Sequence, residues 1–179
     1  MTHSFHTCPR LYTSHTLVEG QTILLPDDQA HYLKNVLRQG EGDSVRLFQE
    51  RDGEWLAILS FPAKKSVAAT LQTCLRPANP THPEIHLFFS PIKKDRQDIL
   101  VEKAVELGVT HLHPVVFARS IVRDIKSERV RSQLIEAAEQ CERLDVPDML
   151  PVMDLKKSLS LWNPAWPLFA AIERQESSQ

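Results

Sequence analysis

Hydrophobic and polar residues alternate with a period of two over three stretches in the first half of the chain. Successive side chains of a strand point to opposite faces of a sheet, so this alternation predicts half-buried β-strands. Asp52-Gly53 predicts a tight turn between the first two of them. The alternating apolar positions are Val45 and Leu47, then Trp55, Ala57, Leu59 and Phe61, then Val67, Ala69 and Leu71.

One helix precedes these strands. It is predicted to begin at Asp27, whose carboxylate suits the free amides of a first helical turn, and to end before Gly40. Its spacing directs Leu33, Val36 and Leu37 inward. The strands and this helix together predict a small β-barrel carrying one helix.

A proline-rich segment follows the last alternating stretch. Residues 77–83 hold three prolines, which exclude a helix and favour an extended linker. We therefore predict two domains, residues 1–76 and residues 84–179, joined by a linker at residues 77–83.

Beyond the linker the hydrophobic period changes. The pattern predicts a strand over 85–90, a helix over about 94–107 closed by Gly108, and a strand over 111–117. A second helix over about 127–144, ended by Pro147, has its apolar residues on a single stripe that packs onto a sheet. The stripe consists of Val130, Leu134, Ala137, Cys141 and Leu144.

A final apolar run, Pro167 to Ile172, predicts one more strand. The order strand, helix, strand, helix, strand is typical of a parallel sheet with right-handed crossovers. The sequence ends at Gln179 shortly after this run, so we expect the sheet to be unfinished within this chain.

Composition changes this picture only slightly. The formal net charge of −2 gives no global signal for nucleic acid. Between Lys93 and Arg131 there are nine Lys or Arg and six Asp or Glu, which is only a mild surplus of positive charge. The three cysteines are odd in number and far apart, which indicates reduced thiols. No signal peptide and no apolar stretch of membrane-spanning length is present, so a cytoplasmic protein is expected.

Glycine content and histidine spacing bear on cofactors and metals. The chain has five glycines and none follows Gly108, so the second domain is predicted to lack a glycine-rich cofactor cradle. His111 and His113 alternate on one strand and share a face, but no third ligand stands at a recognisable spacing. We predict no metal site.

Cationic side chains leave two interpretations open. Lys93, Arg96 and Lys103 lie on one flank of the predicted helix over 94–107, where they either hold phosphates or form a solvated face with neighbouring glutamates. Glu139 and Arg143 have the spacing of an intrahelical ion pair, worth about 0.3 to 0.5 kcal/mol.

Several segments resemble, in order and spacing, a known family. The first domain carries Arg10-Leu11-Tyr12, then His31-Tyr32-Leu33-Lys34-Asn35-Val36-Leu37-Arg38, then Gly42-Asp43-Ser44-Val45-Arg46-Leu47-Phe48. The second carries Lys93-Lys94-Asp95-Arg96, Glu102-Lys103-Ala104-Val105-Glu106-Leu107-Gly108-Val109, Arg119-Ser120-Ile121-Val122 and Ala137-Ala138-Glu139-Gln140-Cys141-Glu142-Arg143. These segments are similar to the RsmE family of ribosomal RNA methyltransferases and cover nearly the whole chain.

The resemblance implies a fold and an activity. It implies an α+β PUA-like RNA-binding β-barrel followed by an α/β SPOUT methyltransferase domain of the trefoil-knot type, here only its first half. It further implies transfer of a methyl group from S-adenosylmethionine to N3 of a uridine in 16S ribosomal RNA, by a protein that is commonly a homodimer.

The chain departs from the family pattern in its donor site. The Gly-Pro-Glu-Gly-Gly and Leu-Arg-x-Glu-Thr-Ala segments of that family are absent, and Val105 and Ala118 stand where Thr and Glu are common. We therefore expect no residue of this chain to bind the cofactor. Two hypotheses remain: an enzyme whose remaining segment lies elsewhere, or an RNA-binding fragment without catalysis. A fragment that folds poorly because of an open sheet edge is a weaker third.

The family context also assigns candidate residues. Transfer to a uridine in ribosomal RNA needs a cationic surface that holds the phosphates. Glu106 and Glu139 are interpreted as structural partners of these cations. The predicted RNA-binding residues are Arg10, Arg38, Lys93, Arg96, Lys103, Gln140 and Arg143, in which the Gln140 amide can read a base edge.

Overall fold

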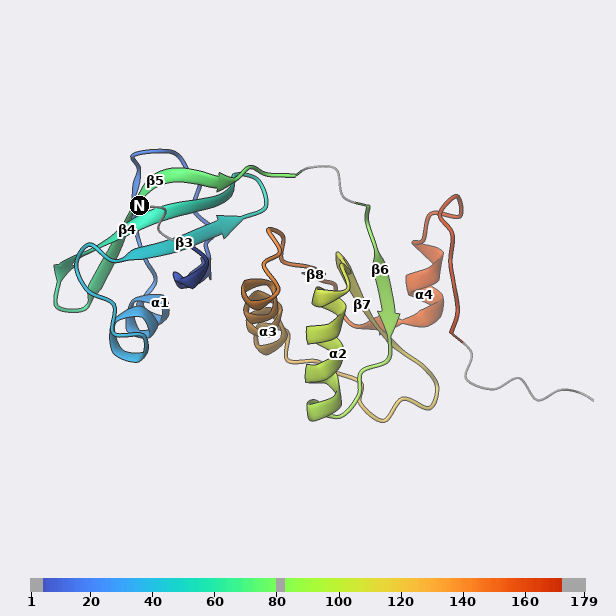
Figure 1. Ribbon diagram of the computed structural model, residues 1–179. Coiled ribbons are helices and arrows are strands. Elements are labelled where there is room, and N and C mark those ends of the chain that lie inside the picture. The colour runs from blue at the N-terminus through green and yellow to red at the C-terminus, as the bar shows by residue number, and fades with distance from the viewer. Residues whose placement is uncertain (1–4, 80–82, 172–179) are drawn as a thin grey trace, which may run out of the picture.

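The computed structural model describes residues 5–79 and 83–171, and it contains two β-sheets that follow one another along the chain (Figure 1). The first sheet has five strands in the order β1-β3-β4-β5-β2, in which β1 is parallel to β3 and the other pairs are antiparallel. Its strands are β1 (Arg10–Tyr12), β2 (Thr22–Leu24), β3 (Ser44–Gln49), β4 (Gly53–Ala63) and β5 (Ser66–Arg76), and a 3₁₀ turn (Phe5–Thr7) precedes them.

The alternating stretches form the long strands, as predicted. Val45, Leu47, Ala57, Leu59, Val67, Ala69 and Leu71 are all buried in one core, and Trp55 and Phe61 pack against it. The sequence did not predict β1 and β2, because three residues are too short to show a period. The Asp52-Gly53 turn is confirmed, with Gly53 at φ +81°.

The first helix begins at Asp27 as predicted, but it differs from the prediction in its N-cap and in one face. Helix α1 (Asp27–His31) continues as a π-helical turn (Tyr32–Val36), and Pro26 rather than Asp27 holds the N-cap position, without a side-chain hydrogen bond. Leu33 is buried and Leu37 is partly buried, but Val36 is 58% exposed. The π-helical turn widens the helix, so the spacing of an α-helix does not hold for its last residues.

The second sheet is parallel, as predicted. It contains β6 (His86–Phe89), β7 (His111–Val116), β8 (Asp148–Met149) and β9 (Met153–Asp154), with β7 paired to each of the others. Helices α2 (Lys94–Glu106) and α3 (Ser127–Gln140) lie on one face, and α4 (Leu155–Ser160) lies on the other (Figure 1). Helix α2 ends before Gly108, which adopts φ +88°.

Two predictions for this region are wrong. Helix α3 ends at Gln140 rather than near residue 144, because Glu142 takes a left-handed conformation with φ +60° and turns the chain away. The predicted final strand is absent from Pro167–Ala171, which have no regular structure, and Ile172 lies outside the described residues. This apolar run is exposed and pairs with no described strand, and Pro167 and Leu168 line a cavity together with Phe88.

Helix α3 joins the two sheets. Its apolar stripe enters the core of the second sheet with Val130, Leu134 and Ala137, and that same core contains Phe48 from β3. Tyr12 from β1 packs against it as well. The two sheets therefore share a hydrophobic core and do not sit on separate bodies.

A candidate RNA-binding surface and its supporting network

Two loops meet at the carboxyl edge of the parallel sheet. The loop after β6 leads into α2, and the loop over residues 117–126 leads from β7 to α3. The Ser90 and Ser120 hydroxyls lie 3.1 Å apart and form a hydrogen bond between the loops, and Ser120 also accepts from the backbone amide of Phe117 at 2.8 Å. Open α/β sheets bind their ligands at this edge.

These loops and the first turn of α2 carry six cations against two acids. All six side chains are exposed, and Phe117 between them is 44% exposed. We call this surface the cationic edge, and its members are Lys93, Lys94, Arg96, Arg119, Arg123 and Lys126, beside Asp95 and Asp124. Within the described part of the chain, Lys93, Arg96 and Arg119 form no ion pair, so their charges face solvent. Such a surface attracts phosphates, and an exposed aromatic ring offers a base a stacking partner.

Two of the predicted RNA-binding residues, Lys93 and Arg96, lie on this edge. Lys103 does not: it lies further along α2, and its ammonium group is 2.9 Å from carboxylate oxygens of both Glu102 and Glu106. These carboxylates raise the pKa of Lys103, chiefly through the hydrogen bonds that its ammonium group donates to Glu106 and Glu102. The solvated-face interpretation holds for Lys103, and Glu106 is its structural partner as predicted.

Arg38 and Gln140 are both exposed, but neither lies on the loops or the helical turn that form the cationic edge. Arg38 follows the π-helical turn with φ +57°. Gln140, the last residue of α3, lines a cavity of about 530 Å³ between α1 and α3. Tyr12, Gln29 and Tyr32 line the same cavity, so two aromatic side chains and the amide of Gln140 share it.

Arg10 and Arg143 are internal, which argues against the predicted contact with RNA. The Arg10 side chain is 3% exposed, and its guanidinium stacks on Phe48 at 3.5 Å from the ring centroid. It donates to the carbonyl oxygens of Ala138 at 2.8 Å and Arg143 at 2.6 Å. Burial lowers the pKa of Arg10, an effect that Glu54 opposes.

The predicted intrahelical pair between Glu139 and Arg143 is wrong, because the helix ends before Arg143. The Arg143 guanidinium instead donates to the carbonyl oxygens of Val105 at 2.7 Å and Val109 at 2.9 Å, and pairs with Asp145. It thereby binds the last turn of α2 through Val105, whose carbonyl oxygen also accepts from the Gly108 amide, and the segment just after the helix through Val109. Glu139 accepts from the backbone amide of Tyr12 at 2.9 Å, and burial raises its pKa.

Glu54 on β4 connects this network. Its side chain is 2% exposed and binds three guanidinium groups, from Arg10 at 3.2 Å, Arg46 at 3.0 Å and Arg76 at 2.6 Å. Arg46 continues to Glu142 at 3.0 Å. A buried cluster of charges thus fixes the end of α3 against the first sheet, and through α3 it fixes the cationic edge.

Sequence reasoning missed Glu54 and four of the six cations of the cationic edge, namely Lys94, Arg119, Arg123 and Lys126. Arg119, Arg123 and Lys126 follow a predicted strand just as Lys93 follows another, and that shared position after parallel strands was a usable signal. Glu54 gave no signal, because an isolated glutamate at a strand start has no pattern of its own.

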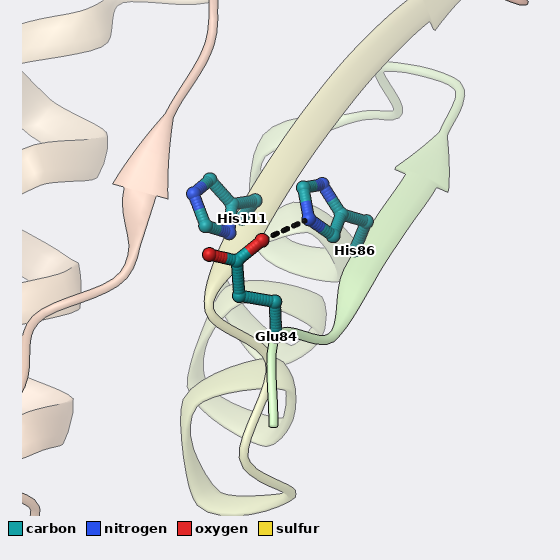
Figure 2. Close-up of side chains that lie close together, drawn as sticks. All are labelled: Glu84, His86 and His111. Carbon is teal, nitrogen blue, oxygen red and sulfur yellow. Dashed lines mark hydrogen bonds and ion pairs between the residues drawn. The ribbon is translucent and has the colours of Figure 1, made fainter. Parts of the chain in front are cut away.

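Histidines gather at the opposite edge of the sheet. Figure 2 shows Glu84, His86 and His111 with the Glu84 carboxylate directed toward the His86 ring, at 3.4 Å between Oε2 and Nε2. The rings of His86 and His111 are stacked, with centroids 4.2 Å apart. His113 shares this face, as the alternation predicted, and its Nε2 is 2.8 Å from Nδ1 of His86. Burial, with smaller contributions from His86 and His111, lowers the pKa of His113 to about 4.

A β-sheet domain packs on a parallel α/β domain whose carboxyl edge is cationic, and such an edge suits the binding of a nucleic acid. Comparison with known families makes this specific. A PUA domain of RNA methyltransferases matches residues 25–72, and an RNA methyltransferase domain matches residues 79–179. The chain belongs to this RNA methyltransferase family.

Individual relatives of this chain are named as ribosomal RNA methyltransferases. The chain is 34% identical over 139 residues to ribosomal RNA small subunit methyltransferase E of Rickettsia conorii, covering 77% of this chain and 57% of the relative. The Bacillus subtilis protein of the same name is 25% identical over 153 residues, covering 82% and 60%. The chain thus spans about three fifths of the length of these relatives.

Solved structures share the fold. Ribosomal RNA small subunit methyltransferase E of Neisseria gonorrhoeae, bound to S-adenosyl methionine, matches with a TM-score of 0.75 and 32% identity, over 88% of this chain and 66% of that one. A putative methyltransferase of Legionella pneumophila, in complex with the same cofactor, matches with a TM-score of 0.77 and 26% identity, over 89% and 72%.

The two loops of the cationic edge do not have the glycine-rich backbone of a cofactor cradle. A cofactor cradle needs backbone that approaches the ligand closely, and neither loop of the cationic edge contains glycine. No catalytic step is therefore assigned to these residues. The helices in the described ranges are all too short or too polar to cross a bilayer.

Proposed function

We propose that this chain supplies the ribosomal RNA-binding surface, and the first part of the catalytic domain, of an enzyme that methylates N3 of a uridine in 16S ribosomal RNA. The observation that carries the proposal is the cationic edge, at the place where a parallel sheet binds ligands, in a member of an RNA methyltransferase family. The methyl donor is S-adenosylmethionine, which two related structures hold.

In this proposal the residues have three different roles. Lys93, Arg96 and Arg119 hold phosphates, and Arg38 provides a contact on the first domain. Gln140 binds a base edge in the cavity beside Tyr12. Arg10 and Arg143 act from inside, by keeping α3 in place.

The same proposal includes organisation beyond the described contacts. We place the domain boundary at residues 77–83, so that residues 1–76 and 84–179 are the two domains. The knotted topology, the homodimer and the cytoplasmic location follow from the family resemblance, and they belong to the complete enzyme.

RNA binding is tested by two matched neutral substitutions on α2. Each phosphate contact contributes about 0.7 to 0.9 to the slope of log affinity against log salt concentration. We expect Lys93→Gln to lower the affinity for a 16S ribosomal RNA transcript several-fold and to reduce that slope by about one. Lys103→Gln is the control, because glutamates already neutralise its charge. Fluorescence anisotropy at several salt concentrations measures both effects; equal losses in both variants contradict the proposal.

Methylation is tested on small ribosomal subunits that lack the modification. The chain is incubated with them and S-adenosylmethionine, and the nucleosides are then analysed by mass spectrometry. Formation of 3-methyluridine supports the enzyme. Salt-dependent RNA binding without 3-methyluridine supports the alternative, a non-catalytic RNA-binding fragment, which the glycine-free loops of the cationic edge favour.

A further inference from the structure

The amino edge of the parallel sheet brings three possible metal ligands together. Glu84 lies directly before β6, and His86 and His111 are register partners at the starts of β6 and β7. One ligand atom from each of these side chains lies within 4.8 Å of the others. Figure 2 shows that the carboxylate stands between the strands and close to both rings.

The pair Glu84 and His86 already has the spacing of metal ligands. Zinc binds nitrogen and oxygen at about 2.0 to 2.2 Å, so two ligands of one tetrahedral ion stand about 3.4 Å apart. The Glu84 and His86 ligand atoms are 3.4 Å apart. His111 has to turn about its Cβ–Cγ bond, because its ring is stacked on His86 with an interplanar angle of 4° and parallel rings do not aim at one ion.

Neighbouring side chains support the histidines as a metal site requires. A histidine ligand is oriented by a hydrogen bond from its other ring nitrogen. His86 has this arrangement, since its Nδ1 is 2.8 Å from Nε2 of His113 while its Nε2 faces Glu84. Thr110 Oγ1 lies 2.9 Å from Nδ1 of His111 in the stacked position of the ring, and this contact changes when the ring turns toward an ion. All three histidines are half-buried, so their side chains have less conformational freedom to lose when a metal binds.

We propose that Glu84, His86 and His111 bind one transition-metal ion of the zinc class, with His113 as a positioning residue. Two imidazoles and a carboxylate suit this class, and a fourth position stays open to water. The site lies at the amino edge of the sheet, opposite the cationic edge. Its effect is to link the segment before β6 to the start of β7, so it stabilises the fold and takes no part in RNA binding.

Calorimetric titration of the tag-free, full-length chain with ZnCl2 at neutral pH tests the site. We expect one ion per chain, and no saturable binding of MgCl2, because Mg²⁺ prefers oxygen ligands in octahedral geometry. We expect Glu84→Gln, His86→Gln and His111→Gln each to lower zinc affinity at least tenfold, and His113→Gln to lower it about 10- to 100-fold. His31→Gln, at an exposed histidine on α1, is the matched control and leaves the affinity unchanged.

Folding is monitored by circular dichroism in each variant, and Glu84→Gln alters an exposed side chain that the fold does not need. Zinc is also expected to raise the unfolding temperature of the wild-type chain and not that of His111→Gln. The proposal is overturned if the wild type shows no saturable binding, if the double variant His86→Gln/His111→Gln keeps the wild-type affinity, or if His31→Gln loses as much as His111→Gln.

Discussion

At the scale of single residues, buried charge holds the molecule together. Glu54 is buried and binds three arginines, of which Arg10 and Arg46 are buried too, and its removal leaves the guanidinium group of Arg10 without this counter-charge. Breaking a buried pair costs more than the pair contributes, because the remaining ion is desolvated and unpaired. This residue therefore matters more for stability than the exposed ion pairs on α2.

Glu54→Gln is expected to lower the free energy of unfolding by about 3 to 5 kcal/mol. The amide keeps the shape of the side chain but lacks its charge. Urea unfolding followed by circular dichroism measures the change. Glu19→Gln, at an exposed position, is the control and stays within about 0.5 kcal/mol of the wild type. A loss below about 1 kcal/mol for Glu54→Gln would show that Arg10 finds another partner.

At the scale of elements, turns fix how the strands and helices meet. Gly53 begins β4 with φ +81°, and a Cβ there would stand 2.1 Å from the carbonyl oxygen of Arg76. The turn is thus closed against the end of β5, where Arg76 joins the Glu54 network. Glu142 has the same function after α3, because its left-handed conformation brings Arg143 under the end of α2.

Gly20 and Gly53 both have a positive φ, so substitutions at the two positions distinguish the cost of a left-handed backbone from the cost of a steric clash. Gly20 has φ +76° with no atom within 4 Å of the Cβ position, so Gly20→Ala meets only the left-handed penalty of about 1 to 2 kcal/mol. Gly53→Ala meets the same penalty and a backbone clash, and we expect it to cost at least 1 kcal/mol more. Thermal unfolding of both variants measures the difference. Equal losses of stability in the two variants would mean that the ends of β4 and β5 can move apart without further cost.

At the scale of the whole molecule, the two sheets behave as one cooperative unit. Phe48 of β3 is fully buried in the core of the second sheet, and Arg10 binds the end of α3. A bundle of apolar and charged contacts of this kind couples the unfolding of both parts. It also sets the angle between the first domain and the cationic edge, on which simultaneous contact with one RNA depends.

The tryptophans test this coupling, because Trp55 reports on the first sheet and Trp162 and Trp166 report on the second. We expect the urea unfolding curves of Trp55→Phe and of the double variant Trp162→Phe/Trp166→Phe, followed by fluorescence, each to coincide with the curve from circular dichroism. In the Phe48→Ala background, which loses about 3 to 5 kcal/mol, the two reporters are expected to separate. If the two fluorescence unfolding curves already differ while Phe48 is present, the shared core is contradicted.

The sequence by itself determined the local order of this protein. The period of two predicted the long strands, the stripe from Val130 to Ala137 predicted the face of α3 that packs on its sheet, and Gly53 and Gly108 marked a turn and a helix end. The family was also readable, because its motifs are contiguous segments. These features depend on neighbours in the chain, so a linear pattern records them.

Only the tertiary structure decided which charges are free and which are internal. Arg10 and Arg96 are indistinguishable as arginines in a sequence, yet Arg10 is buried against α3, 128 residues further along, while Arg96 faces solvent. The meeting of Glu84, His86 and His111 likewise depends on the register of β6 with β7. Contacts between distant segments arise from packing and strand pairing, and local spacing carries no record of them.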